Sequence, residues 1–266
     1  MDKLSDLLKD CRLCDLPRAV KTGYSNDLIS HFSRGSLIVV SAVPSMGKSC
    51  FVINIAKKTA LNDNTVLIFS DELSKFEILS RMFSSEAKVD HLRLANGRVT
   101  QEEWSQIESI SQKLSETNIF IDDTCFISSS ELLGKCLSVK SGENGLDLVI
   151  IDRIDMLRLN EAEERLDKAS VLKKIARQLD VPIIVTSCIH RETGIQKRKD
   201  KTPKWSDLDA DMFRHVDTII FLHREYYYDL NADKNRLNII CPQGFPLGSA
   251  QLEWQPAFLS VEDISI

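Results

Sequence analysis

The ten residues from Ser41 to Cys50 constrain the fold of this chain more than any other stretch. Their sequence is Ser-Ala-Val-Pro-Ser-Met-Gly-Lys-Ser-Cys, and a short β-branched apolar run, Leu37–Val40, precedes them. Residues 51–58 follow with the spacing of an amphipathic helix. Strand, tight loop and helix form the context that a phosphate-binding loop requires. The pattern therefore predicts such a loop, together with the first core strand and the first helix of an α/β domain.

The chemistry of this loop depends on backbone donors and on two side chains. Backbone N–H groups and the positive end of the helix dipole favour phosphate groups, and Gly47 permits close approach of the backbone. Lys48 is expected to reach the β- and γ-phosphates, and the hydroxyl of Ser49 to bind Mg²⁺. The predicted nucleotide-binding residues are Pro44, Ser45, Met46, Gly47, Lys48, Ser49 and Cys50. Because Ala42 stands where such loops usually begin with Gly, a simple strand-to-helix turn is the alternative.

Two further apolar runs end in carboxylates. Residues 65–70 lead into Asp71 and Glu72, and residues 147–151 lead into Asp152. Since ligands of open α/β sheets bind beyond the carboxyl ends of the strands, these groups should lie beside the phosphate loop. Glu72 is the candidate for orienting and deprotonating an attacking water, and Asp152 for holding Mg²⁺ through its water shell. The alternative for Asp152 is a carboxylate that merely ends a strand. The alternative for Asp71 and Glu72 is capping of the next helix. We favour capping for Asp71, whereas spacing alone does not decide between capping and catalysis for Glu72.

The rest of the chain alternates between helical and strand patterns. Helices are predicted at residues 74–86, 101–116, from Ser128 onward, and 161–179, the last with Leu166 facing inward. Strands are predicted at residues 118–122, 181–187 and 216–223, with a closing hairpin at 236–241 and 249–254. This alternation indicates an α/β fold: a mostly parallel sheet with helices on both faces and an antiparallel C-terminal edge. Residues 1–21 are expected to form an N-terminal helical segment and residues 22–266 one domain.

Composition excludes several classes of protein. The chain has no apolar run of about 18 residues and no signal-peptide core at its N-terminus, so no membrane partner is expected. Seven scattered cysteines do not form a disulfide framework, which favours a reducing cytoplasmic location. The lone Cys11-Arg12-Leu13-Cys14 lacks a second ligand pair for zinc and is interpreted as an ordinary reduced pair. A net charge of −5 gives no overall electrostatic footprint for nucleic acid.

One local basic cluster stands out against this charge. Its members are Lys197, Arg198, Lys199, Lys201 and Lys204. The cluster fits a solvated surface loop and fits equally a loop that contacts the phosphates of single-stranded DNA. Asp200 within it and the acidic residues after it keep both interpretations open. The aromatic run at residues 226–228 could stack on bases, but an edge or interface cluster is favoured.

From Thr22 onward the chain resembles the C-terminal RecA-like ATPase domain of DnaB-type replicative helicases. The resemblance rests on residues 22–24 (entry motif), 42–49 (phosphate loop, in which the family also begins with Ala), 69–73 (second motif) and 151–157 (Walker B segment), with 206–208, Asp217 and 246–248 at later family positions. It implies a RecA-like P-loop NTPase fold, ATP and Mg²⁺ as cofactors, and work in DNA replication. It also implies that Glu72 is the catalytic glutamate.

The departures from the family pattern concern hydrolysis and DNA contact. Cys188 stands where the family has a Gln that senses the γ-phosphate, and Asp209 replaces the Arg of its DNA-binding loop. By the resemblance, Cys241 and Gln243 replace the Lys-x-Arg pair that reaches into a neighbouring subunit's ATP, and we expect no counterpart of the family's N-terminal scaffold domain in this sequence. An arginine finger contributes about 10³–10⁵ in rate in well-studied NTPases. We therefore expect binding of nucleotide and Mg²⁺, with slow hydrolysis unless a partner supplies a finger.

Two functions from different classes fit these features. One is a DnaB-family helicase-like ATPase that acts on single-stranded DNA in replication. The other is a helicase-derived adaptor, whose nucleotide state controls binding to another replication protein or a helicase ring. The missing finger and the negative net charge favour the adaptor, whereas the retained phosphate loop, Glu72 and Asp152 fit both. Oligomerisation is compatible with either, and a RecA-type recombinase is a weaker third interpretation.

Overall fold

The computed structural model describes residues 19–160, 163, 166–190, 194–208, 214–244 and 246–264. The expected N-terminal helical segment and the Cys11–Cys14 pair lie outside these ranges, except for the end of that segment. There, strand β1 (Val20–Lys21) pairs antiparallel with β2 (His31–Phe32). Within the described ranges, no helix is long and apolar enough to cross a membrane.

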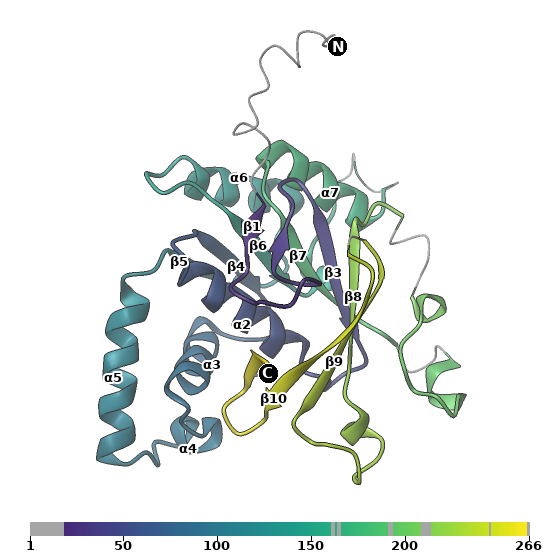
Figure 1. The fold of residues 1–266 in the computed structure, drawn as a ribbon. Coiled ribbons are helices and arrows are strands. Elements are labelled where there is room, and N and C mark those ends of the chain that lie inside the picture. Colours follow the sequence, from purple (N-terminus) through teal and green to yellow (C-terminus); the bar gives the residue numbers. More distant parts are fainter. Residues whose placement is uncertain are drawn as a thin grey trace.

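A nine-stranded sheet forms the centre of the fold, in the order β11-β10-β9-β8-β3-β7-β6-β4-β5 (Figure 1). The parallel strands are β3 (Leu37–Ala42), β4 (Val66–Ser70), β5 (Ile119–Asp122), β6 (Leu148–Asp152), β7 (Ile183–Cys188) and β8 (Thr218–His223). The antiparallel edge is β9 (Arg236–Gln243), β10 (Gly248–Gln255) and β11 (Ser260–Asp263). The predicted fold class, a mostly parallel sheet with an antiparallel C-terminal edge, is confirmed.

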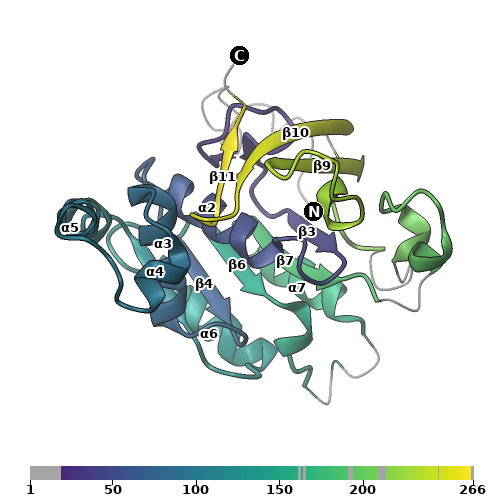
Figure 2. The same ribbon diagram turned by 90° about the horizontal axis from the view of Figure 1, so that it is seen from below.

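Helices cover both faces of this sheet (Figure 2). They are α2 (Lys48–Ala60), α3 (Lys75–Ala87), α4 (His91–Ala95), α5 (Gln101–Ser115), α6 (Ser129–Lys140) and α7 (Lys168–Leu179). Short 3₁₀ turns occur at Ile154–Met156, Gly194–Lys197, Trp205–Asp207 and Glu225–Tyr227. On one face α2 contacts α3, which contacts α4 and α5, and on the other face α6 packs on α7. The phosphate-loop helix α2 therefore lies between the sheet and a helical layer.

Reciprocal capping boxes define where three of these helices begin. The pairs are Ser74 with Glu77 in α3, Thr100 with Glu103 in α5, and Ser128 with Glu131 in α6. In each pair the side chain of the first residue accepts the backbone N–H of the second, whose carboxylate accepts the backbone N–H of the first. The predicted start of a helix at Ser128 is confirmed.

The helix predicted at residues 161–179 was placed too early. Helix α7 begins at Lys168, because the carboxylate of Asp167 accepts the backbone N–H of Ser170 at 2.7 Å and caps the helix there. Leu166 precedes this cap and is exposed, not inward as the helical spacing predicted. The helical spacing of apolar residues extends upstream of Asp167 in the sequence. Spacing alone therefore does not show that the helix begins after this capping residue.

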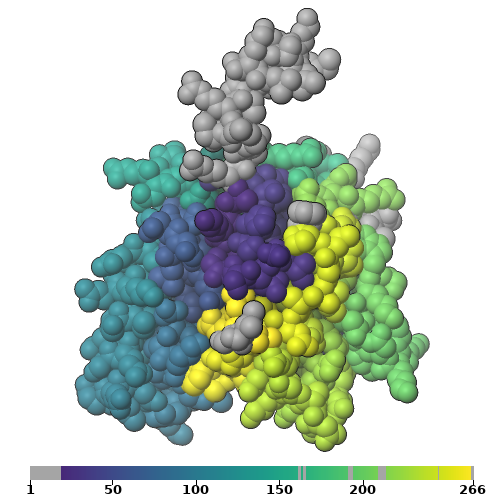
Figure 3. All heavy atoms as spheres, in the orientation of Figure 1, coloured from purple at the N-terminus to yellow at the C-terminus, as the bar shows by residue number. Residues whose placement is uncertain are grey.

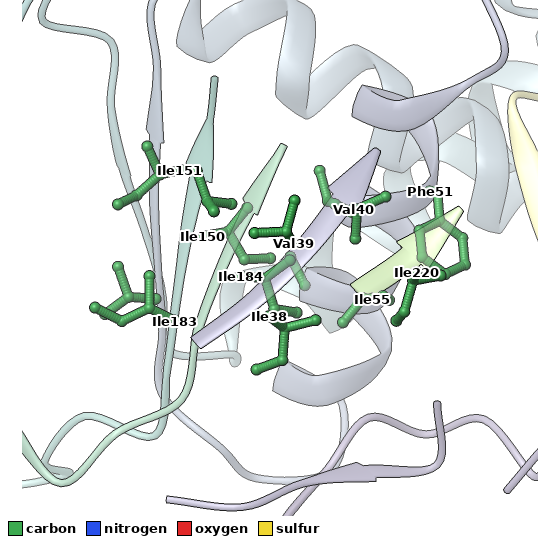
Figure 4. Close-up of a cluster of buried hydrophobic side chains, with 14 of the residues drawn as sticks. Ile38, Val39, Val40, Phe51, Ile55, Ile150, Ile151, Ile183, Ile184 and Ile220 are labelled. Atoms are coloured by element: carbon green, nitrogen blue, oxygen red, sulfur yellow. The ribbon is translucent and has the colours of Figure 1, made fainter. Parts of the chain in front are cut away.

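The core is built around β3, in which every residue is buried. Figure 4 shows Val39 and Val40 of this strand among Ile150 of β6, Ile184 of β7 and Phe51 of α2. A central parallel strand is covered on both faces, which explains its unbroken β-branched sequence. Each such side chain contributes roughly 1.5–3 kcal/mol when it is fully buried. This packing holds the loop between β3 and α2 on a rigid base.

The two ends of the described chain meet on one surface, where the purple N-terminal segment lies beside the yellow C-terminal strands (Figure 3). The hydroxyl of Tyr24 donates to the carbonyl of Val261 in β11 at 2.9 Å. The backbone N–H of Ser25 donates to the carboxylate of Asp263 at 2.8 Å. Residues 22–25 are thereby fixed to the last strand of the sheet.

Candidate nucleotide-binding site

A cavity of about 450 Å³ opens at the carboxyl end of the parallel strands, against the loop that joins β3 to α2. Its lining residues are Pro44, Ser45, Gly47, Lys48, Ser49, Cys50, Glu72, Arg81, Arg153, Cys188, Arg224, Trp254 and Leu259. A hollow of about 830 Å³ beside β1 is larger, but it does not collect phosphate-loop residues. Every predicted nucleotide-binding residue lines the smaller cavity except Met46, whose side chain is buried in the core.

The loop requires glycine at position 47 for two reasons. The φ angle of Gly47 is 99°, in the left-handed region that side chains disfavour. A Cβ atom at this position would also lie only 3.1 Å from the indole ring of Trp254 in β10. Gly47 is the N-cap of α2 and gives it no side-chain cap, so the first backbone N–H groups of the helix can bind a ligand. The turn is thus shaped as an anion site.

Lys48 begins α2 and folds back over the loop. Its side chain is mostly buried, and its Nζ donates to the carbonyls of Ala42 at 3.2 Å and Val43 at 3.5 Å. Both of these acceptors are neutral carbonyls, so they do not offset the positive charge of the ammonium as a carboxylate would. The structure therefore places a fixed cation at the floor of the cavity, where Ser49 also contributes its hydroxyl.

Asp152 lies at the end of β6, and 3% of its surface is exposed. One carboxylate oxygen accepts a hydrogen bond of 2.6 Å from the hydroxyl of Thr186 on β7, which leaves the other oxygen for a ligand. Parallel pairing aligns Ser70 with Asp152, so Glu72 follows one strand away. A hydroxyl and one carboxylate suit Mg²⁺, which usually keeps several waters and takes phosphate oxygens as ligands. In the described residues, no group of three or more His, Cys, Asp or Glu side chains could hold a metal.

Glu72 and Arg153 form an ion pair on the wall of the cavity. The Nη1 atom of Arg153 lies 3.0 Å from Oε1 of Glu72, and its Nε lies 3.9 Å from Oδ2 of Asp155. Burial opposes the positive charge, but the carboxylates of Glu72 and Asp155 outweigh it and raise the pKa of Arg153 above its ordinary value. The candidate catalytic carboxylate is thus held by a cation of the same chain.

The preference for Asp71 as a helix cap is wrong, because Ser74 caps α3 with its own side chain. The backbone N–H of Asp71 points at the carbonyl of Asp152, 3.4 Å away, and its Oδ1 is buried with no hydrogen-bond partner among the described residues. Burial raises the pKa of this carboxyl, against the opposing charge of Arg153. Asp71 therefore packs against the end of β6 and is absent from the lining of the cavity, whereas Glu72 faces it.

Five cavity residues were not predicted as site residues from the sequence: Arg81, Arg153, Arg224, Trp254 and Leu259. The guanidinium of Arg224, which follows β8, lies 4.9 Å from the centre of the Trp254 ring. Burial lowers the pKa of Arg224, and its Nε has no hydrogen-bond partner in the part of the chain that the structure describes. These residues are far from the phosphate loop in sequence and reach it only through the strand order. Of the five, Arg153 alone lies within a recognised motif, the segment of residues 151–157.

Three of the free cysteines occupy informative positions. The thiol of Cys50 donates to the carbonyl of Leu259 at 2.7 Å, and burial raises its pKa to about 12. Cys188 ends β7 and lines the cavity beside Arg153. The thiol of Cys241 is buried and donates to the carbonyl of Gln243, whose amide donates to the carbonyl of Val216. The two residues predicted to replace the family's Lys-x-Arg pair therefore have side chains bonded within this chain.

No residue of the basic cluster lines the cavity, and two of its five cations, Arg198 and Lys204, are paired with carboxylates. Arg198 forms a bidentate pair with the buried carboxylate of Asp207, at 2.7 and 2.8 Å. Lys204 pairs with Asp200 at 3.3 Å, and Lys201 donates to the carbonyl of Gln196.

Two members of the cluster present their charge to solvent. Lys197 and Lys199 are exposed, and neither has an ion pair with any residue that the structure describes. Asp209, the predicted replacement of the family's DNA-loop Arg, lies outside the described residues. Arg236, the first residue of β9, forms an ion pair of 3.1 Å with Asp233. This pair lies at a separate hollow, at the end of the β9–β10 hairpin opposite its turn.

Comparison with known proteins identifies the family of this chain. Residues 19–263 match the family described as DnaB-like helicase C terminal domain. The chain is 34% identical over 247 residues to the replicative DNA helicase DnaC of Bacillus subtilis (strain 168), covering 88% of this chain and 54% of that protein. It is 33% identical to the replicative DNA helicase DnaB of Geobacillus stearothermophilus, with the same coverage. The chain thus spans about half the length of these relatives.

Solved structures give the same result. One solved ATPase domain superposes with a TM-score of 0.87 and 26% identity, covering 98% of this chain and 97% of that one. A DnaB-like replicative helicase, described together with its interactions with primase, superposes with a TM-score of 0.86 and 25% identity, covering 100% of this chain and 68% of that one. With the family match over nearly its whole length, the chain belongs to the DnaB-like helicase C-terminal domain family.

Proposed function

We propose that the protein binds ATP and Mg²⁺ in the phosphate-loop cavity and acts as a helicase-like ATPase in DNA replication. The observation that carries this proposal is that Lys48 and Glu72, which follow β3 and β4, line one cavity, while Asp152 ends the neighbouring strand β6 directly before Arg153 on the cavity wall. Its relatives are named replicative DNA helicases, which supports replication as the process. The free cysteines suit a reducing, cytoplasmic location for this work.

Each group has a separate task in this mechanism. Backbone N–H groups of the loop and the ammonium of Lys48 bind the phosphates. The hydroxyl of Ser49 would hold Mg²⁺ directly and the carboxylate of Asp152 would hold it through its water shell; the metal would supply charge neutralisation for the phosphates. Glu72 orients the attacking water and accepts its proton. Pro44, Ser45 and Cys50 shape the wall of the cavity, and Met46 anchors the loop in the core.

The first experiment is steady-state ATP hydrolysis by the protein with and without single-stranded DNA. Strong stimulation by DNA would mean a DNA-dependent motor. Tight ATP binding with negligible turnover in both conditions would mean a nucleotide-gated adaptor for another replication protein or a helicase ring. The adaptor is the second candidate because Cys241 and Gln243 are engaged inside the chain and Arg198 is paired with Asp207. Absence of nucleotide binding would refute both.

The role of Glu72 has a direct test. We expect Glu72→Gln to keep ATP affinity within about twofold and to lower turnover by roughly a hundredfold or more, since general base catalysis contributes that much. Single-turnover hydrolysis and equilibrium binding measure the two quantities separately. Glu108→Gln on the exposed face of α5 is the matched control. An unchanged rate in Glu72→Gln would remove this residue from the catalytic role.

A further inference from the structure

Arg153 occupies a position that the proposed mechanism has not used. It directly follows Asp152 at the end of β6, with β4 on one side and β7 on the other. Its side chain lies between Glu72, which follows β4, and Cys188, which ends β7. All of these residues except Asp152 line the same cavity as Lys48 and Ser49.

The donors of this guanidinium are only partly engaged. Nη1 donates to Glu72, whereas Nε is buried, lies 3.9 Å from Asp155 and has no hydrogen-bond partner within the described ranges. Arginine carries five N–H donors in a planar fork that matches a phosphate group. The ion pair with Glu72 and the contact with the thiol of Cys188 therefore fix the side chain in place without exhausting its five donors, and 31% of the side chain remains exposed.

The neighbouring side chains leave a need for such a cation. Cys188, at the end of the adjacent strand, can offer a phosphate only a weak S–H donor. Lys48 is the cation on the loop side of the cavity, and its Nζ is held by the carbonyls of Ala42 and Val43 at the floor. A phosphate that extends beyond the loop toward β6 would meet Arg153, which stands on that wall.

We propose that Arg153 is a cis-acting arginine of the nucleotide site, which positions Glu72 and binds the outermost phosphate of a nucleoside triphosphate. The inference rests on the proposed function, because it assumes nucleotide in this cavity. It makes the site selective: a diphosphate that fills the loop contacts Lys48 but does not reach Arg153. One chain would then provide a cation that does not depend on a neighbouring subunit.

The test compares the affinities of a non-hydrolysable ATP analogue and of ADP in equilibrium titrations. We expect Arg153→Ala to weaken binding of the triphosphate analogue by roughly tenfold to a hundredfold, as for loss of a charged hydrogen bond. ADP affinity should stay within about twofold, and Arg153→Lys should recover part of the loss. Arg98→Ala, an exposed arginine at the start of the loop before α5, is the matched control.

Two results would overturn the inference. Equal weakening for both nucleotides would mean that Arg153 only maintains the shape of the site, and no weakening would mean that it only pairs with Glu72. Repeating the substitution in a Glu72→Gln background separates direct from indirect action, since a direct phosphate contact keeps its effect there. Thermal unfolding identifies a variant that fails to fold, in which case Arg153→Gln, closer in shape, replaces Arg153→Ala.

Failure of this inference differs from failure of the proposed function. If the unaltered protein binds neither nucleotide, the cavity is not a nucleotide site. If it binds both and Arg153→Ala shows no selective loss, the nucleotide site stands and only the role of Arg153 is refuted.

Discussion

The phosphate-loop cavity and the segment of residues 194–208 are both rich in cations, but the two regions differ in what those cations face. In the cavity, Lys48 is held by neutral carbonyls, and Arg153 keeps an Nε donor unused among the described residues. In residues 194–208, the guanidinium of Arg198 forms a bidentate ion pair with the buried carboxylate of Asp207. Two regions with similar sequence charge therefore present very different fields to an anion. The ability of such a region to bind an anion therefore depends more on whether carboxylates lie beside its cations than on the number of cations.

The largest expected effect comes from removal of the loop lysine. Lys48→Ala should weaken ATP binding by roughly a hundredfold or more, the usual result of truncating a buried charged partner (about 3 kcal/mol). The ammonium contacts only loop carbonyls within the described chain, so its removal should leave thermal stability almost unchanged. Isothermal titration with ATP measures the effect, and Lys174→Ala on the exposed face of α7 is the control. Unchanged affinity would remove the distinction between the two regions.

The ion pair inside residues 194–208 gives the next largest effect. Asp207→Asn should destabilise the protein by about 2 kcal/mol, because the guanidinium of Arg198 loses a charged, bidentate acceptor. Urea denaturation measures the change. Asp200→Asn breaks the exposed pair with Lys204 and should cost less than about 1 kcal/mol.

The same variant sharpens the comparison in a second assay. If the ion pair with Asp207 prevents Arg198 from contacting phosphates, Asp207→Asn should raise the affinity of the protein for single-stranded DNA at low salt. Equal stability and equal DNA affinity in Asp207→Asn and the unaltered protein would show that the bidentate pair has no such role.

The two regions also differ in how far the sequence alone could predict them. The phosphate loop is local: strand, turn and helix are continuous in sequence, and the glycine at position 47 marks the left-handed turn. The carboxylates Glu72 and Asp152 were found because they follow apolar strands. The sheet class and strands β3 to β10 followed from the same patterns, whereas β1, β2 and β11 were not predicted. What failed were features set by side-chain partners, such as the cap at Asp167 that starts α7 and the exposure of Leu166.

Long-range neighbours were beyond the sequence for a physical reason. Trp254 packs on Gly47, and Arg224 stacks on Trp254, because β10, β9, β8 and β3 lie in that order in the sheet. No local periodicity encodes that order. Likewise, the pairing of Arg198 with Asp207 depends on a loop conformation that charge counting left open.

A smaller effect is expected at the metal-binding side of the cavity. Asp152→Asn should raise the Mg²⁺ concentration needed for tight ATP binding by about tenfold, as for residues that act on a metal through its waters. The hydrogen bond from Thr186 can be kept by the amide oxygen, so folding should be preserved. Titration of ATP affinity against Mg²⁺ measures it, with Asp27→Asn, an exposed carboxylate that does not line the cavity, as the control. Identical Mg²⁺ dependence in the two variants would contradict the assignment.

The smallest effect concerns the two exposed lysines of residues 194–208. Changing both Lys197 and Lys199 to Ala should weaken binding of single-stranded DNA only a few-fold at low salt. The slope of the logarithm of affinity against the logarithm of salt should fall by about 0.7 for each phosphate that the variant no longer neutralises. A control with the same change in net charge replaces the exposed Lys174 and Lys234.

The salt slope decides how this result bears on the comparison. A selective fall in the double variant would mean that residues 194–208 touch DNA through the lysines that face solvent. Equal behaviour of the variant and its control would mean that the segment is a solvated loop. Any DNA contact would then have to come from another surface, and the result would favour the adaptor function over the DNA-dependent motor.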